Sequence, residues 1–272
     1  MKASQVLRPK SPQLFKGTLL VSVAMLVVFA IASSLRPWSP KRGLGLAFGM
    51  LAAALFVFEM LYPARRPRAV LLGSARSWLQ AHVYAGVLGL VAALVHSGLA
   101  WPSGRLGFWL LLLALWTSFS GLVGVWLQKW IPAALAEGLR VEALYERIPA
   151  LVQELRDQAD KLVEGSSDVL DRFYKSEVRD PLGVLQPSWA FLMDVRGGRE
   201  RALEPFRRVA QFVEEDEKEK VDDLISLYTE KLELDAHYSL QGLLRRWLVL
   251  HVPAAGALIG LLVVHVFGWV FY

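Results

Sequence analysis

Long apolar segments separated by charged stretches dominate the hydropathy pattern of this 272-residue chain. Four of them reach the roughly 20 residues needed to span the hydrocarbon of a bilayer. We predict membrane-spanning helices over residues 44–62, 79–101, 106–131 and 248–272. A shorter fifth segment, residues 18–35, follows a basic leader and ends in Ala30-Ile31-Ala32, which resembles a signal-peptidase site. We favour a retained helix there, with cleavage as the alternative.

The polar segment before the last apolar one, residues 132–242, has a different pattern. Apolar residues recur in it at helical spacing, and Gly165, Pro181 and Pro187 mark turns. We therefore predict a small helical bundle inserted between two parts of a membrane domain, residues 1–131 and 243–272. The expected fold class is all-α: an integral membrane bundle of about five transmembrane helices with a helical insert before the last one.

Basic residues predict the side of the membrane on which the insert lies, because Lys and Arg accumulate in cytoplasmic loops. The leader and the loop with Arg65, Arg66 and Arg68 are basic, whereas the turn 102–105 is short and nearly neutral. This pattern places the insert in the cytoplasm, although the basic connector 36–43 then falls outside. We expect a multi-pass protein of the inner (cytoplasmic) membrane.

Composition narrows the possible chemistry. The sequence contains no cysteine, which excludes disulfides, thiolate metal sites, iron–sulfur clusters and covalently attached c-type haem. The net charge is only +5, and the basic residues gather beside apolar segments. We therefore expect the lipid bilayer as a partner and no nucleic acid.

Four of the five histidines lie in two predicted membrane helices, His82 and His96 on one and His251 and His265 on the other. Each pair is fourteen residues apart, which at about 1.5 Å and 100° per residue gives about 21 Å along the axis and nearly the same face. One helix and the insert separate the two helices, so both run in the same direction. His82 then matches His251 in depth, and His96 matches His265, so each pair can supply two axial imidazoles to a haem iron.

Small residues near these histidines fit a flat macrocycle, because they let the ring approach the helix backbone. Gly86, Gly89 and Ala93 share the face of His82 and His96. The alternative is that small residues serve plain helix packing and that a single histidine is a hydrogen-bonded packing residue. Two equal spacings at matched depths argue against coincidence. Polar residues at membrane depth are costly, so their presence there indicates a function. We favour the haem interpretation.

The spacing His82-x13-His96 with His251-x13-His265 resembles the haem core of the ferric reductase and NADPH oxidase superfamily of transmembrane b-type cytochromes. The resemblance covers the membrane part only and implies two haem b cofactors with these four histidines as axial iron ligands. The large insert is unusual for that core. The insert also lacks a GxGxxG fingerprint, so we do not expect the chain to oxidise NAD(P)H itself.

Several arginines lie near the expected ends of the haem site. Arg76, Arg245 and Arg246 precede the inner pair of histidines and are candidates to neutralise the propionates of the inner haem. Arg105 is the equivalent candidate at the outer haem. Ordinary interfacial anchoring explains these arginines equally well.

Further residues of the membrane helices and the insert are polar or small, and each suggests its own role. Glu59 lies at the depth of the inner haem and is a candidate proton relay or quinone ligand, with a snorkelling interfacial carboxylate as the alternative. Ser120, Gly121 and Gly124 are predicted to mark close helix packing. His237 stands in a polar stretch and is predicted to be a surface histidine.

These features predict a dihaem cytochrome b membrane subunit that transfers electrons across the bilayer. The donor would be a quinone/quinol pool or a cytoplasmic donor, and the partner a multihaem cytochrome or a reductase subunit. An electron-transfer subunit of an oxidoreductase complex fits better than a self-contained enzyme, because the sequence shows no separate catalytic site. The alternative is a non-redox membrane scaffold or sensor whose helical insert binds a cytoplasmic partner.

Overall fold

A computed structural model describes residues 11–61, 74–138, 144–188, 190 and 198–271, except the side chains of residues 75–76, 132–138 and 199. The described residues are helical and contain no strand, which confirms the all-α prediction. They divide into two compact units. The membrane unit comprises Met1–Leu127 and Trp247–Tyr272, and the insert unit comprises Gln128–Arg246.

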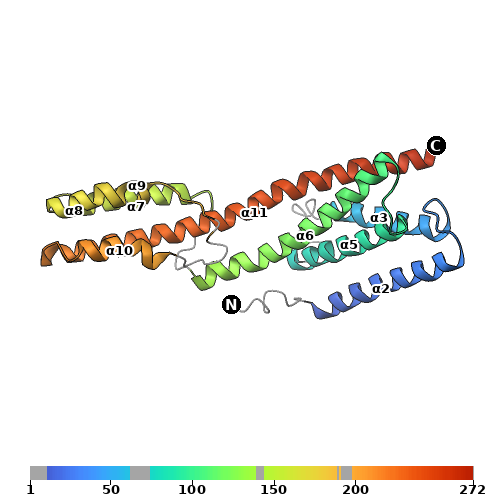
Figure 1. The fold of residues 1–272 in the computed structure, drawn as a ribbon, viewed down its shortest axis with the longest axis horizontal. Coiled ribbons are helices and arrows are strands. Elements are labelled where there is room, and N and C mark those ends of the chain that lie inside the picture. The colour runs from blue at the N-terminus through green and yellow to red at the C-terminus, as the bar shows by residue number, and fades with distance from the viewer. Residues whose placement is uncertain (1–10, 62–73, 139–143, 189, 191–197, 272) are drawn as a thin grey trace. The chain divides into compact units, whose positions relative to one another are not determined.

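Five helices contribute to the membrane unit: α2 (Pro12–Leu35), α3 (Gly43–Glu59), α5 (Ala75–His96), the first part of α6 (Arg105–Gly138) and the last part of α11 (Lys218–Phe271). Within the described residues, α2, α5, α6 and α11 are long and apolar enough to cross a membrane, and α3 is a shorter apolar helix of 17 residues. Both α2 and α3 pack against α5 (Figure 1). These helices indicate a multi-pass membrane protein.

The core of the membrane unit joins four of its helices. Ala52 and Phe56 of α3, Ala92 of α5, Ala114 of α6 and Leu258 of α11 form one buried cluster. Many large apolar side chains point outward instead, as expected for helices whose outer faces meet lipid. The common core holds α5 and α11, which carry the histidines, beside α3 and α6.

The end of α5 and the start of α11 differ from the predicted ones. Helix α5 ends at His96, five residues before the predicted end, because Gly98 and Leu99 adopt left-handed backbone angles (φ 72° and 56°). The Leu99 N–H donates to the Leu94 carbonyl and closes the helix. Helix α11 begins at Lys218, so the last apolar segment is the final part of a 54-residue helix that starts in the insert.

The insert unit is a small helical bundle, as predicted. It contains α7 (Ile148–Val163), α8 (Asp168–Phe173), a π-helical turn (Tyr174–Val178), α9 (Arg179–Gly183), α10 (Arg199–Val209) and the first part of α11. Helix α7 buries one apolar face, formed by residues spaced three or four apart. These residues are Ile148, Val152, Leu155, Ala159 and Val163.

The prediction that His237 is a surface histidine is wrong. His237 is only 4% exposed, and Lys231, Glu233 and Asp235 of the same stretch of α11 are also buried. Lys231 Nζ donates to Asp235 Oδ2 at 2.6 Å. A polar sequence here does not mean exposure, because buried charges on one helix can satisfy each other four residues apart.

Candidate functional site

The structure gives His96 an orienting contact from α3. His96 Nδ1 lies 2.8 Å from the carbonyl oxygen of Gly45. A carbonyl can only accept, so Nδ1 carries the proton and Nε2 is left as the basic ring nitrogen. Gly49 makes room for the ring, since a Cβ at this position would lie 2.6 Å from His96 Nδ1.

His82 has an equivalent contact at the other end of α3. Its Nδ1 lies against the carboxylate oxygen Oε2 of Glu59, the last residue of α3, and both side chains are largely buried. A carboxylate beside Nδ1 fixes the orientation of the imidazole and makes it a stronger electron donor. Glu59 therefore lies in contact with a predicted ligand, in addition to lying at its depth.

His251 is held by α6. Its Nδ1 lies 2.8 Å from Ser120 Oγ, and Ser120 Oγ donates to the Thr117 carbonyl at 3.1 Å. When the serine proton goes to Thr117, Ser120 Oγ accepts from Nδ1 of His251, and Nε2 is left as the basic nitrogen. The contact joins α6 and α11 inside the membrane unit.

Trp247 supports the same contact. Its Nε1 donates to the Ser120 carbonyl at 2.7 Å, and its ring stacks on that of His251 with centroids 5.2 Å apart. Gly124 permits this packing, because any Cβ there would overlap the Trp247 ring. The sequence predicts Ser120 and Gly124 only as helix-packing residues, so sequence reasoning missed their role in orienting a histidine.

The four histidines meet in the two predicted pairs. The rings of His96 and His265 have centroids 6.4 Å apart and are nearly perpendicular, with an interplanar angle of 83°. His82 and His251 are close enough to interact electrostatically. Each pair joins α5 to α11, as the sequence spacing predicts.

Gly86 and Gly89 on α5 have another role than making room for a macrocycle. The nearest side-chain atoms to a Cβ at Gly89 belong to Leu55 and Phe56, and those nearest to Gly86 belong to Glu59. These three neighbours all belong to α3. Gly86 and Gly89 therefore serve the close packing of α3 on α5, which was the alternative interpretation.

The four arginines that we predict as haem propionate partners lie in different surroundings. Arg105 is exposed at the start of α6, and the side chain of Arg76 lies outside the described residues. Arg245 pairs with Glu146 and lies 4.2 Å from the ring centre of Tyr145, and Arg246 lines a cavity of the insert unit. Their roles as propionate partners stay predictions.

Two further findings concern the chain as a whole. Among the described residues, no group of three or more His, Cys, Asp or Glu side chains is arranged to hold a metal ion. Comparisons with protein-family models, with curated proteins and with solved structures found no match for this chain. The function of this chain is therefore inferred from the geometry of the two histidine pairs.

Proposed function

We propose that this chain is a dihaem b-type cytochrome that carries electrons across a membrane. The observation that supports it best is the arrangement of the four histidines in two cross-helix pairs, three of them with Nδ1 held by a separate group. Histidines that bind a metal typically hydrogen-bond through their other ring nitrogen to a carboxylate or a carbonyl. Here the three partners are a carbonyl, a hydroxyl and a carboxylate.

The separation of the outer pair fits two axial imidazoles on one iron. A metal–imidazole bond is about 2.0 Å and the ring centre lies roughly 1.1 Å further, so two rings on opposite sides of one ion have centres roughly 6.2 Å apart. The His96 and His265 centroids are 6.4 Å apart. A haem needs only two protein ligands because its porphyrin supplies the other four, so two pairs suffice without a cluster of three.

The bound haems would supply reversible one-electron chemistry, and the chain's residues would set its conditions. His82 and His251 would hold the inner haem, and His96 and His265 the outer one. The contacts to Glu59, Ser120 and Gly45 would orient three of these four rings. The electron donor in this proposal is a quinol or a cytoplasmic donor, and the acceptor is a redox protein such as a multihaem cytochrome or reductase subunit.

The first test compares electron donors. Two haems are one-electron carriers, and hydride chemistry belongs to a flavin or nicotinamide site. NADH alone should therefore leave the haems of the purified chain oxidised, whereas a menaquinol or ubiquinol analogue should reduce them in stopped-flow absorbance measurements. Rapid reduction by NADH without an added flavoprotein would contradict the proposal.

The quinol arm also tests Glu59. Quinol oxidation releases protons, and Glu59→Gln keeps an acceptor for His82 but cannot take up a proton. We expect haem content to stay the same while quinol-driven reduction slows by about 100-fold, as for loss of a general base. The exposed Glu177→Gln is the matched control and should change neither quantity. An unchanged rate in Glu59→Gln would make this carboxylate a positioning residue only.

A second test concerns the side of the membrane on which the insert lies. The chain has no cysteine, so Ser176→Cys introduces a single reactive thiol at an exposed position of the insert unit. A membrane-impermeant maleimide should label it in inverted membrane vesicles and leave it unlabelled in intact cells or spheroplasts, because the arginine loop predicts a cytoplasmic insert. The cysteine-free chain controls for background. Labelling from the outside alone would reverse the proposed topology.

A further inference from the structure

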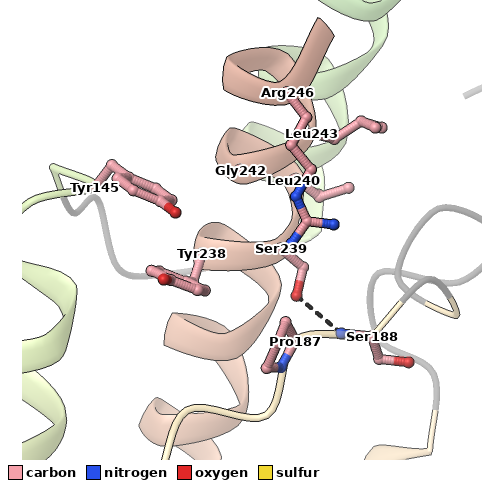
Figure 2. A pocket seen from close by; sticks show the side chains of 9 residues that line it. All are labelled: Tyr145, Pro187, Ser188, Tyr238, Ser239, Leu240, Gly242, Leu243 and Arg246. Atoms are coloured by element: carbon pink, nitrogen blue, oxygen red, sulfur yellow. Dashed lines mark hydrogen bonds between the residues drawn. The ribbon is translucent and has the colours of Figure 1, made fainter. Parts of the chain in front are cut away.

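A cavity of about 190 Å³ lies within the insert unit, at the end of its α11 segment (Figure 2). Three parts of the chain form it: Tyr145 before α7, the segment after α9, and α11. Its lining residues are Tyr145, Pro187, Ser188, Tyr238, Ser239, Leu240, Gly242, Leu243 and Arg246.

Two tyrosines form one wall. The rings of Tyr145 and Tyr238 are stacked, with centroids 4.6 Å apart and planes 7° from parallel. A Cβ on Gly242 would lie 3.6 Å from the Tyr145 ring, so Tyr145 lies along α11 over Tyr238 and Gly242. The hydrogen bond between the two phenol groups raises the pKa of Tyr145.

The opposite wall is tied to α11 by hydrogen bonds. The Ser188 N–H donates to Ser239 Oγ at 3.1 Å (Figure 2). Ser239 Oγ in turn donates to the Asp235 carbonyl at 2.7 Å. The Gln186 N–H donates to the Asp235 carboxylate at 3.0 Å. The segment after α9 is therefore fixed beside the helix, so the cavity has walls from both sides.

The charge in and around the cavity favours an anion. Arg246 is the charged residue among the nine lining residues, none of which is a carboxylate. Figure 2 shows its side chain directed back along α11 toward Ser239. Arg245, the preceding residue, lies over the Tyr145 ring and pairs with Glu146. A guanidinium matches the geometry of a phosphate group.

We propose that this cavity binds the phosphate of an anionic membrane phospholipid, an inference that goes beyond the proposed electron transfer and does not depend on haem. Arg246 stands directly before Trp247, where the apolar part of α11 begins. Tryptophan at the end of an apolar helix marks the level of lipid headgroups, and basic pockets at that level recognise anionic lipids. Pro187, Leu240 and Leu243 give the cavity apolar surface for the glycerol carbons.

The test uses the full chain in a neutral detergent and three soluble probes: dihexanoyl phosphatidylglycerol, dihexanoyl phosphatidylcholine and inorganic phosphate. Isothermal titration should show saturable binding of one phosphatidylglycerol per chain and weaker binding of the zwitterionic lipid. Inorganic phosphate should compete only weakly, because it lacks the carbon chain. Equal binding of the two lipids, or free phosphate binding as tightly as phosphatidylglycerol, would overturn the lipid assignment.

Arg246→Gln removes the guanidinium and should weaken phosphatidylglycerol binding about tenfold or more, equivalent to about 1.4 kcal/mol. Arg36→Gln is the matched control, since Arg36 is an exposed arginine at the end of another apolar helix and does not line the cavity. Arg246→Lys keeps the charge without the fork and should also bind more weakly, which preserves the test if the Gln variant folds poorly. Loss of haem from Arg246→Gln with unchanged lipid binding would return Arg246 to its predicted propionate role and overturn the proposal.

Discussion

Replacement of His96 or His265 by alanine should remove one haem from the purified protein and leave the other. The two ring centroids lie 6.4 Å apart on α5 and α11, so under the proposed function loss of either ring would remove one of two axial ligands of the same iron. Replacement of His82 or His251 should remove the other haem, because these two form the second pair. Haem content should fall from two per chain to about one in each variant.

The remaining haem identifies the pair that was lost. Redox titration monitored by absorbance should show one midpoint potential missing in His96→Ala and His265→Ala, and the other missing in His82→Ala and His251→Ala. His237→Gln is the control, because His237 is the fifth histidine and lies in the insert unit. Loss of both haems from all four single variants, with the folded structure retained, would argue against two independent pairs.

Replacement of Lys231 by methionine should destabilise the insert unit by about 3–5 kcal/mol. Lys231 and Asp235 are 1% and 2% exposed, and their 2.6 Å contact is the ion pair that compensates the buried carboxylate. The Gln186 N–H also donates to this carboxylate, so an uncompensated charge would disturb the segment after α9 as well. Urea unfolding followed by circular dichroism of the full chain measures the loss.

A second Lys–Asp pair in the same unit supplies the control. Lys175 and Asp171 are also four residues apart on a helix, but their side chains are 66% and 40% exposed. Lys175→Met should therefore cost no more than about 0.5 kcal/mol. The double variant Lys231→Met with Asp235→Leu should regain most of the lost stability, because an apolar pair carries no desolvation cost. Equal effects of Lys231→Met and Lys175→Met would show that burial of the pair is unimportant.

The loss in Lys231→Met should also depend on pH. Burial raises the pKa of the Asp235 carboxyl. A carboxyl whose pKa is higher in the folded than in the unfolded state binds its proton more readily when folded, so folding gains stability as pH falls. Lys231 lowers this pKa in the wild-type chain, so Lys231→Met should raise it further, and the deficit of the variant relative to the wild-type chain should shrink toward acidic pH.

The sequence predicts the fold well because its strongest signals are long and periodic. Apolar segments of membrane length and the helical period of the insert are set by local composition. The structure confirms the helical insert and, among the described residues, four apolar helices long enough to cross a membrane. Helix α3, in the predicted span 44–62, is shorter, with 17 residues. Helix ends were less accurate, since Gly98 and Leu99 end α5 through backbone angles that hydropathy does not encode. His237 was misplaced because a polar stretch was taken for an exposed one, although the Lys231–Asp235 pair lies buried beside it.

For the candidate site, the sequence predicts the histidine pairs but not the groups that contact their Nδ1 atoms. Equal spacing of fourteen residues pairs the histidines across α5 and α11, because helix geometry alone determines their depth and face. The partners of their Nδ1 atoms come from α3 and α6, far away in the sequence. A backbone carbonyl such as that of Gly45 has no side-chain signal, and Ser120 resembles any small residue of a packed membrane helix. Contacts of this kind depend on tertiary packing, which the pattern along one helix does not specify.

Haem content is the quantity on which the proposed function depends most directly. A pyridine haemochromogen assay of the purified chain, with protein determined by amino-acid analysis, measures it without assuming a donor, an acceptor or a topology. Two haem b per chain is the expected result, because the proposed function assigns the four histidines as two pairs of axial ligands. A purified, folded chain without haem, obtained from cells supplied with haem, would contradict the assignment of the histidine pairs as iron ligands.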